Sequence, residues 1–482
     1  MQTDDKSSVI FGNPIDEKTL RKAERSKKSF IRKFGDDSEK EYHLGLEPVE
    51  QIKEIKILKM VHSELPLIMP EKPLIVGNIR MGFGHYRISM AIASCAQALG
   101  YQPLWLDLAS FEATGSAMIR SQNDLYSLGS KLSQKIGLFN RLVWEPMNSE
   151  GFRKLTYNAS DQKNAELLVP LFQDIPQDTP YVATHVWPSQ AAVHAGMTHV
   201  VNAIPDNWPM ALHLSEGAIH TVQTPFAYLG YKMLNGMAKE ALKPMPDDSL
   251  YQVGHYVDHE LVSNIEKDCE ARKARLASGK PVRFLLTVGG AGAGADLYLS
   301  MMKHLMTYVE NEKASVIVNF GDHLTMYDFF KKNIPGFENK CVKFFNKYEM
   351  LEAFVKKMDG NLKAGIYVVS NDDIFEAVYA TNLLMRKCDV CVTKPSELSF
   401  YPVPKLMMKH IGGHEVYGAI HAQELGDSTF ECEDETSLNR MIDTLINDRC
   451  IIKTMCDRIV ELKAARIYDG GYEVVKLAAG ER

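Results

Sequence analysis

The chain has 482 residues, a formal net charge of -6, 45% hydrophobic residues and 24% charged residues. A single hydrophobic core rarely grows beyond about 250–300 residues, so this length predicts two domains and an appendage. The slight acidic excess excludes the general basic field typical of nucleic-acid-binding proteins, and no nucleic-acid partner is expected. No apolar run reaches the roughly 18–20 residues of a membrane-spanning helix, and the first residues lack a signal-peptide apolar core.

The eight cysteines are scattered along the chain, a distribution that favours a reducing cytoplasm over a disulfide framework. Cys388 and Cys391 form a lone CxxC pair within KCDVCVT, which has the pattern of a buried strand. A structural zinc site of this type needs a second pair of ligands, and none lies nearby. Buried structural thiols are therefore favoured over zinc or redox chemistry.

Residues 1–71 differ from the rest of the chain and are predicted to form a helical N-terminal extension. Eight lysines and arginines occur between Lys18 and Lys33, opposed only by Glu24 and interspersed with a thin apolar side. A basic helix over residues 18–34 could lie on an anionic membrane surface or on a partner. This interpretation would make the protein cytoplasmic and peripheral on the inner membrane face. The alternative is a solvated helix packed on the main body.

The first main domain is predicted over residues 72–250 and opens with a strand, a glycine loop and a helix. An apolar run over 74–79 is followed by Gly82-Phe83-Gly84-His85 and then by an Ala-rich helical pattern. Backbone N–H groups and the positive end of a helix at such a junction suit an anion, and glycines let a ligand approach closely. His85 stands where an imidazole could take a proton from a hydroxyl. The alternative is a tight turn without a ligand.

Polar side chains follow several other predicted strands of this domain. Short apolar runs predict strands over residues 103–108, 181–185, 199–204 and 219–223. In a parallel sheet the carboxyl ends of the strands share one edge, and ligands gather there. The side chains expected at this edge are His85, His185, Asp206, Trp208 and Gln223.

The second main domain is predicted over residues 251–455, and it repeats the opening architecture. A strand over 283–288 runs into four glycines that precede a helix, and backbone N–H groups of such a loop suit a diphosphate. These glycines are Gly289, Gly290, Gly292 and Gly294. Four more strands, each leading into a polar or glycine-containing loop, are predicted over residues 315–320, 342–345, 365–369 and 390–393.

The alternation of strands and helices in both halves predicts an α/β protein with two Rossmann-like domains facing a cleft. A C-terminal helix is predicted over residues 456–482.

The order and spacing of these motifs over roughly residues 73–460 resemble a GT-B glycosyltransferase, specifically the group of monogalactosyldiacylglycerol synthase and the N-acetylglucosaminyltransferase MurG. Gly82-Phe83-Gly84-His85 is similar to that group's GxGH loop, whose histidine is proposed to act as base or to orient the acceptor. Gly289-Gly290-Ala291-Gly292 resembles its donor-diphosphate loop. Thr393-Lys394-Pro395-Ser396 resembles its TK-x-G segment, and Gly412-Gly413-His414-Glu415 resembles its PGQE-type loop near the donor sugar.

The polar strand ends and the motifs that resemble the family together give two sets of predicted site residues. Those on the acceptor side are Gly82, Gly84, His185 and Trp208. Those that bind the donor are Gly289, Gly290, Gly292, Gly294, Lys394, Ser396, Glu397, Gly413, His414 and Glu415.

One position departs from the family's pattern. The family's ribose-binding glutamate, about eight residues after the TK-x-G lysine, falls here within residues 400–404, which contain no carboxylate. A changed donor, a ribose contact through Glu397, or lost transferase activity could each follow.

The function that these features imply is transfer of a sugar from a nucleotide-diphosphate sugar to a hydroxyl of a small-molecule or lipid acceptor. We expect His85 to activate the acceptor, Asp206 to assist it, and Glu415 to hold donor sugar hydroxyls. Glycine N–H groups and Lys394 could neutralise the leaving diphosphate without a metal, so no cofactor is expected. Asp206 and Asp372-Asp373 leave a divalent ion as an alternative.

Two other functions are open at this stage. A sugar-nucleotide epimerase or hydrolase would need several acid or base carboxylates, which Asp206, Asp322, Asp372 and Glu415 could supply. A noncatalytic sugar-nucleotide-binding protein would account for the missing ribose glutamate.

Overall fold

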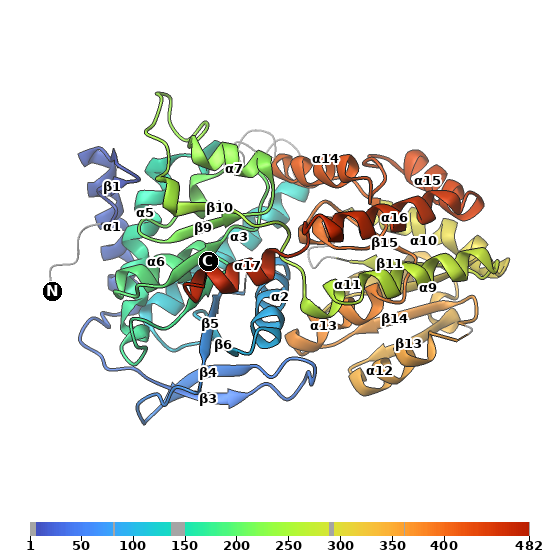
Figure 1. The fold of residues 1–482 in the computed structure, drawn as a ribbon, viewed down its shortest axis with the longest axis horizontal. Helices are drawn as coiled ribbons and strands as arrows, with labels where there is room; N and C mark the ends of the chain where they lie inside the picture. The colour runs from blue at the N-terminus through green and yellow to red at the C-terminus, as the bar shows by residue number, and fades with distance from the viewer. Residues whose placement is uncertain (1–5, 81, 136–149, 289–293, 361, 482) are drawn as a thin grey trace. The chain divides into compact units, whose positions relative to one another are not determined.

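The computed structural model describes residues 6–80, 82–135, 150–288, 294–360 and 362–481. The chain divides into two compact units: the first comprises Met1–His259 with Asp469–Arg482, and the second comprises Glu260–Tyr468. Each unit is built around a largely parallel sheet covered by helices (Figure 1). The predicted class, an α/β protein with a parallel sheet in each of two domains, is confirmed.

The first unit contains an eight-stranded sheet in the order β10-β9-β8-β7-β5-β6-β4-β3. Neighbouring strands are parallel except for β3 and β4, which are antiparallel. Leu74, Ile75 and Val76 of β5 are fully buried, as expected for a central parallel strand covered on both faces. The strands are β3 (His43–Pro48), β4 (Leu58–Ser63), β5 (Pro73–Asn78), β6 (Gln102–Asp107), β7 (Tyr181–Ala183), β8 (Val200–Ala203), β9 (Ile219–Val222) and β10 (Leu250–Gln252).

Helices surround this sheet, and a two-stranded ribbon of β1 (Val9–Ile10) and β2 (Asn13–Pro14) lies near the start of the chain. The helices of the first unit are α1 (Glu17–Phe34), α2 (Gly84–Ala98), α3 (Thr114–Lys135), α5 (Leu155–Ala165), α6 (Val186–His194), α7 (Pro225–Lys232) and α17 (Gly470–Ala478).

The second unit contains a six-stranded, all-parallel sheet in the order β13-β14-β12-β11-β15-β16. Its strands are β11 (Val282–Thr287), β12 (Ala314–Asn319), β13 (Cys341–Phe345), β14 (Ile366–Ser370), β15 (Val390–Thr393) and β16 (Lys405–Met407). Short α8 (His259–Val262) leads into this unit, whose other helices are α9 (Ile265–Ala277), α10 (Ala295–Glu310), α11 (Thr325–Asn333), α12 (Tyr348–Lys357), α13 (Ile374–Met385), α14 (Val416–Leu425), α15 (Glu435–Asn447) and α16 (Cys450–Ala464).

The buried apolar runs predicted most of these strands. Every strand predicted from such a run is present, with its ends displaced by at most two residues. Cys388 and Cys391 are fully buried on either side of the start of β15, in agreement with the interpretation of structural thiols. The described strands that were not predicted are short or lie toward the sheet edges, and they are β1, β2, β3, β4, β10 and β16.

The expectation that residues 1–71 form a helical extension is wrong for much of this segment. β3 and β4 belong to the main sheet, because β4 pairs in parallel with β6. β3 contains a glycine and ends in a proline, and Leu44 is its only buried residue. Such an edge strand lacks the strong apolar pattern of a central strand, so the sequence did not indicate it.

The predicted basic helix is present as α1, and it packs on α5 and α3. Its Phe30 and Ile31 side chains contact the hydrophobic core of the first unit. The apolar side of α1 therefore faces the protein body, as the alternative interpretation holds. The basic side chains that remain exposed are Lys18, Arg21, Lys22, Arg25, Lys28, Arg32 and Lys33.

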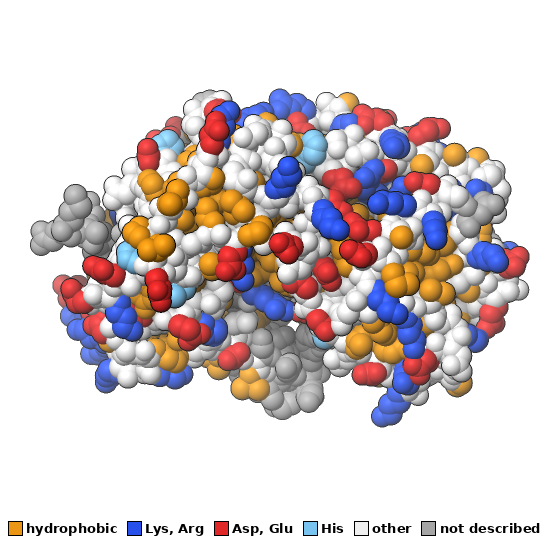
Figure 2. Space-filling view, turned by 90° about the horizontal axis from the view of Figure 1, so that it is seen from below, with side chains coloured by type: hydrophobic (Ala, Val, Ile, Leu, Met, Phe, Trp, Pro, Cys, Tyr) orange, Lys and Arg blue, Asp and Glu red, His pale blue; other side chains and the backbone are white. Residues whose placement is uncertain are grey.

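Surface features agree with the modest net charge of the chain. The face in Figure 2 carries acidic and basic side chains intermingled over both units. Within the described ranges, no helix combines the length and apolar character needed to cross a membrane.

The boundaries between the units differ from the predicted ones in two places. The first unit continues past residue 250 because β10 pairs with β9 in its sheet. The predicted C-terminal helix over 456–482 is divided: α16 packs on α9 in the second unit, whereas α17 packs on α2 in the first.

Two glycines let α17 pack closely against the rest of the first unit. A Cβ atom at Gly470 would lie 2.3 Å from the carbonyl oxygen of Gly254, and one at Gly471 would lie 2.8 Å from Cys95 Sγ. Backbone atoms cannot move aside as a flexible side chain can, so Gly470 is required for this packing.

We predict that Gly470→Ala lowers the free energy of unfolding of the first unit by about 1–3 kcal/mol, the usual effect of overpacking. Chemical denaturation followed by circular dichroism measures this loss. Gly360→Ala is the control, because its Cβ would meet only an ordinary contact at 3.5 Å. Equal stability of the two variants would contradict the proposed packing of α17.

Candidate functional site

The strand order of the first unit reverses at β5. The chain passes from β5 through α2 to β6 on one side, and β7 then pairs with the other side of β5. The connections after β5 and β7 therefore diverge, and at such a point α/β proteins usually bind ligands beside the carboxyl ends of the strands. Gly82 and the start of α2, with Gly84 and His85, follow β5, and His185 follows β7.

His85 lies at the start of α2 and is held by a hydrogen bond to the segment that follows β7. Gly82 has a φ of 83°, a left-handed conformation that glycine adopts readily. The His85 Nδ1 atom donates a hydrogen bond to the carbonyl oxygen of Thr184 at 2.6 Å. Because a carbonyl oxygen can only accept, the proton lies on Nδ1 and leaves Nε2 as the basic nitrogen. This tautomer suits a general base.

His185 packs directly against His85. The two ring centroids are 4.9 Å apart, and the ring planes are inclined by 77°. The His185 Nδ1 atom accepts a hydrogen bond from the backbone N–H of Trp187 at 3.2 Å, so its proton lies on Nε2. Burial, followed by the neighbouring His85 and His213, lowers the pKa of His185 well below its ordinary value. His185 is therefore neutral near pH 7 and can donate a hydrogen bond.

A histidine that the sequence analysis did not identify joins this edge. His213 lies in a short 3₁₀ helix after β8, and its Nε2 is 3.0 Å from Asp206 Oδ2. The Asn202 side chain of β8 donates to the His213 carbonyl oxygen at 2.6 Å. Asp206 is more than one-third exposed, whereas His213 is buried. Only the folded loop brings His213 to Asp206, since no sequence motif links them.

Two other residues expected at this edge have structural contacts. The Trp208 ring packs against the Arg153 guanidinium at 4.4 Å and stacks with Phe226 at 6.2 Å. The Gln223 amide donates to the Pro205 carbonyl oxygen and accepts from the backbone N–H of Tyr256. Trp208 thus belongs to a stack of protein side chains, and Gln223 fixes two loops.

A buried carboxyl group lies behind the histidines. Asp161 of α5 is near Trp187, whose ring packs edge-on against His185 with centroids 5.0 Å apart. Burial raises the pKa of Asp161 to about 7, and the Trp187 indole offsets this rise only in part. Asp161 therefore titrates near neutral pH, a property of many functional sites that also occurs at purely structural ones.

The strand order of the second unit reverses in the same way, between β11 and β15. Gly289, Gly290 and Gly292 of the predicted diphosphate loop lie outside the described residues. Gly294 is described, and it precedes α10 with a φ of 78°.

Two loops predicted to bind the donor meet at this edge. Lys394 follows β15, and its Nζ atom forms an ion pair with Glu415 Oε1 at 2.8 Å. The other carboxylate oxygen of Glu415 accepts hydrogen bonds from the backbone N–H groups of Ile411 and Gly412 at 2.7 and 3.4 Å. These contacts hold the Glu415 carboxylate in one orientation while Lys394 stays one-third exposed.

The remaining predicted donor residues shape these loops. The backbone N–H of Ser396 donates to the Lys394 carbonyl oxygen at 2.7 Å, which closes a tight turn. Glu397 begins the 3₁₀ helix that ends at Phe400, and Gly413 begins the one that ends at Glu415. The His414 ring folds over Gly412, where an added Cβ would lie 2.5 Å from it.

The segment at the place of the family's ribose glutamate is part of the core. Lys405 is fully buried, and its Nζ is 2.7 Å from Asp427 Oδ2. The same ammonium donates to the carbonyl oxygens of Tyr401 and Val403 at 2.8 and 3.2 Å. Burial lowers the pKa of Lys405, and Asp427 opposes that shift. Residues 400–404 therefore wrap a buried ion pair rather than offer a carboxylate to a ligand.

The acidic residues considered for a metal or for epimerase chemistry have partners of their own. Asp322 Oδ1 is 2.8 Å from His323 Nδ1. Asp372 accepts from the Asn346 amide at 2.7 Å, and Asp373 caps the N-terminus of α13. In the part of the chain that the structure describes, no three His, Cys, Asp or Glu side chains gather as metal ligands do.

Two family models match this chain. Residues 9–233 match a domain of unknown function, DUF6937, and residues 245–479 match another, DUF6938. No curated protein matches it.

Remote similarity to solved structures extends over most of the chain. The UDP-GlcNAc 2-epimerase from Neisseria meningitidis bound to UDP-GlcNAc is 11% identical, with a TM-score of 0.45, over 84% of this chain and 98% of that one. The alpha,alpha-trehalose 6-phosphate synthase from Burkholderia multivorans is 10% identical, with a TM-score of 0.45, over 85% of this chain and 99% of that one.

We predict that Asp161→Asn stabilises the first unit at pH 8 but not at pH 5. Folding raises the pKa of Asp161, so its contribution to stability is present below the ordinary carboxyl pKa and is lost as the pH rises through about 7. A neutral amide avoids this loss. The thermal midpoint at pH 8 should rise by at least about 2–4 °C, the effect of roughly 1 kcal/mol.

The control is Asp178→Asn, which changes an exposed carboxylate. Its thermal midpoint should shift equally at the two pH values. If Asp161→Asn also shifts equally at pH 5 and pH 8, Asp161 does not titrate between them and the account of its burial is wrong.

Proposed function

We propose that this protein is a GT-B-type enzyme that transfers a sugar from a nucleotide-diphosphate sugar to a hydroxyl group. The observation that carries the proposal is the hydrogen bond from His85 Nδ1 to the Thr184 carbonyl oxygen, at the strand reversal of the first sheet. This hydrogen bond leaves Nε2 as the basic nitrogen of His85. It also lies where α/β proteins usually bind ligands, at the carboxyl ends of the strands. The narrower resemblance to the monogalactosyldiacylglycerol synthase and MurG group stays a prediction.

The first half of the reaction concerns the acceptor. The His85 Nε2 atom takes the proton of the acceptor hydroxyl as its oxygen forms a bond to the anomeric carbon. The Thr184 carbonyl oxygen accepts from Nδ1–H throughout and stabilises the imidazolium that results. Neutral His185 can donate from Nε2, and Asp206, paired with His213, can orient an acceptor hydroxyl.

The second half concerns the donor. As the acceptor bond forms, the bond from the anomeric carbon to the diphosphate oxygen breaks, and its electron pair leaves with the diphosphate. Lys394 can neutralise this negative charge, and the N-terminus of α10 with the preceding glycines can add backbone N–H groups. Glu415, oriented by Lys394 and by two backbone N–H groups, can accept hydrogen bonds from donor sugar hydroxyls.

The acceptor is proposed to be a small molecule or a lipid. The exposed cations of α1 supply attraction to an anionic membrane surface, on the order of 1 kcal/mol for each cation near it. Because Phe30 and Ile31 pack on the protein core, this attraction would be electrostatic and sensitive to salt.

A sugar-nucleotide epimerase or hydrolase is the second candidate. The pairing of Asp206 with His213 favours it, because this edge then carries a carboxylate and an imidazole besides His85. Turnover of a nucleotide sugar without any acceptor would support this reaction over transfer.

We predict that His85→Gln lowers the turnover of a nucleotide-diphosphate sugar at least about 100-fold, the usual contribution of a general base. Donor affinity should stay within about twofold, because the imidazole acts on the acceptor hydroxyl. Product formation by chromatography and donor binding by calorimetry measure the two effects. His62→Gln, at an exposed position of β4, is the control and should change neither. Unchanged turnover in His85→Gln would contradict the role of His85 as base.

We predict that Lys394→Met weakens binding of the donor about tenfold, since a hydrogen bond to a charged group contributes about 1.5–3 kcal/mol. Calorimetry with uridine, guanosine, adenosine and thymidine diphosphates and their sugars identifies the donor and measures the loss. Lys340→Met removes an exposed ammonium paired with Glu310 and serves as the control. If no compound of this panel binds the unmodified protein, the proposed donor site is wrong.

A further inference from the structure

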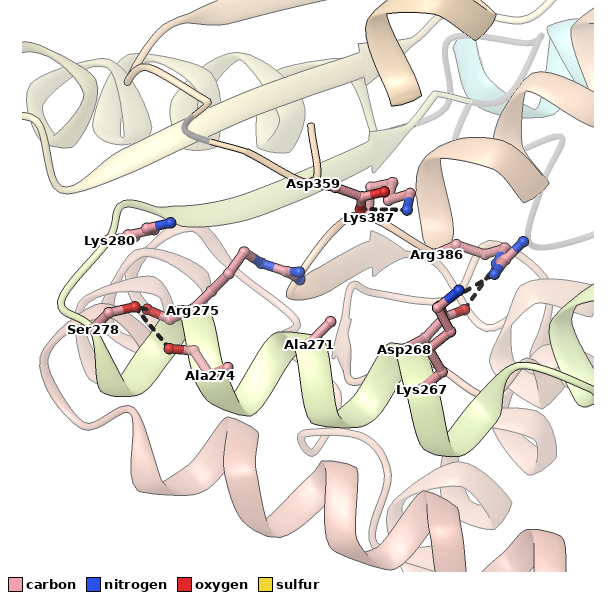
Figure 3. Close-up of a pocket in the computed structure, with 10 residues that line it drawn as sticks. All are labelled: Lys267, Asp268, Ala271, Ala274, Arg275, Ser278, Lys280, Asp359, Arg386 and Lys387. Carbon is pink, nitrogen blue, oxygen red and sulfur yellow. Dashed lines mark hydrogen bonds and ion pairs between the residues drawn. The ribbon is translucent and has the colours of Figure 1, made fainter. Parts of the chain in front are cut away.

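A separate cavity of 360 Å³ lies within the second unit, along one side of α9 (Figure 3). Residues of α9, spaced so that they share one face of the helix, line one wall of the cavity. The turn that follows α13 lines the opposite wall. Lys280 comes just before β11, and Lys387 comes just before β15. The cavity is therefore at the amino ends of these strands. Since β11 has six residues, its two ends are about 20 Å apart, and the donor loops lie at the other end.

The lining carries a strong excess of positive charge. Five of its ten side chains are cationic and two are anionic, in a chain whose overall net charge is -6. The cations enter from two directions, from α9 and the residues after it and from the turn opposite, as Figure 3 shows. They are Lys267, Arg275, Lys280, Arg386 and Lys387.

The two arginines are held in place by carboxylates. Arg275 donates to Asp389 Oδ1 from Nε and Nη2 at 3.2 and 2.7 Å, and both residues are buried. Arg386 pairs with Asp268 at 2.9 Å and with Glu260 at 2.7 Å. These carboxylates neutralise much of the positive charge of the two arginines and hold their side chains in place at the cavity wall.

The lysines supply the charge for a ligand. Lys267 and Lys280 form no ion pair with any described residue. Lys387 pairs at 2.5 Å with Asp359, whose side chain is largely exposed. An incoming anion could share this ammonium, so three of the lining lysines are available to a ligand.

The size and chemistry of the lining limit what fits. Ala271 and Ala274 lie between the charged ends of the cavity, and their small side chains leave the central space open. The lining includes no aromatic residue on which a nucleobase could stack. The volume lies at the lower end of the roughly 300–1,000 Å³ that is usual for small-molecule sites.

We propose that this cavity is a binding site for a compact polyphosphate anion, bound by Lys267, Lys280 and Lys387 at the edge of the sheet opposite the donor loops. A chain of two or three phosphates matches several cations spread over a small cavity better than a single phosphate does. The site is independent of the proposed transferase reaction, because none of its lining residues belongs to the donor or acceptor loops.

Calorimetric titration of the full chain with inorganic tripolyphosphate at about 0.15 M salt tests the site, since exposed charges beyond about 8 Å are screened there. The double variant Lys267→Ala/Lys280→Ala should bind tripolyphosphate at least about tenfold more weakly, because two charge-assisted contacts are lost. Lys273→Ala is the matched control on α9, where its ammonium pairs with Asp457 and Glu270 and does not line the cavity. Its affinity should stay within about twofold of the unmodified protein.

The same titration with Lys394→Met removes any contribution of the donor loops, and the cavity should still bind tripolyphosphate. Thermal melting should show that all variants are folded. The proposal is overturned if tripolyphosphate does not bind at millimolar concentration, if Lys273→Ala weakens binding as much as the double variant does, or if Lys394→Met abolishes it.

Discussion

The reversal of strand order at β5 is the constraint on which the arrangement of the first unit's polar edge depends. β5 pairs with β6 on one side and β7 on the other, so the segments that follow β5 and β7 diverge at one edge of the sheet. One hydrogen bond, from His85 Nδ1 to the Thr184 carbonyl oxygen, joins these segments and sets the histidine tautomer. The polar side chains nearby, His185, His213 and Asp206, have their positions determined by the same sheet.

The second unit has the same reversal of strand order, but other side chains lie at the edge that results. The order reverses at β11, the first strand of this unit, and Lys394 and Glu415 meet at that edge although 20 residues separate them in the chain. Beneath them, the buried pair of Lys405 and Asp427 holds the segment that replaces the family's ribose glutamate. A buried ammonium needs its carboxylate and carbonyl partners, so this segment is committed to the core. A ribose contact, if the donor is a nucleotide sugar, must come from another residue.

Local sequence patterns predicted the central strands well, because a parallel strand covered on both faces is a continuous apolar run such as Leu74-Ile75-Val76. They did not indicate β3 and β4, whose place depends on pairing with β6, a contact distant in sequence. The sequence indicated the place of His85 after the first strand of the sheet because a glycine loop and a helix start mark it locally. His213 was not found, since its approach to Asp206 is created by the fold of the loop after β8. The reversal of strand order, likewise, is a property of the whole sheet.

We propose that a nucleotide-diphosphate sugar binds at the carboxyl edge of the second sheet. Amide hydrogen exchange of the full chain, with and without a saturating nucleotide-diphosphate sugar, tests it most directly because exchange reports local protection segment by segment. We predict slower exchange in residues 394–396 and 411–415, and unchanged exchange in β3 and β4. Unchanged exchange in both loops, with the ligand bound, would contradict it.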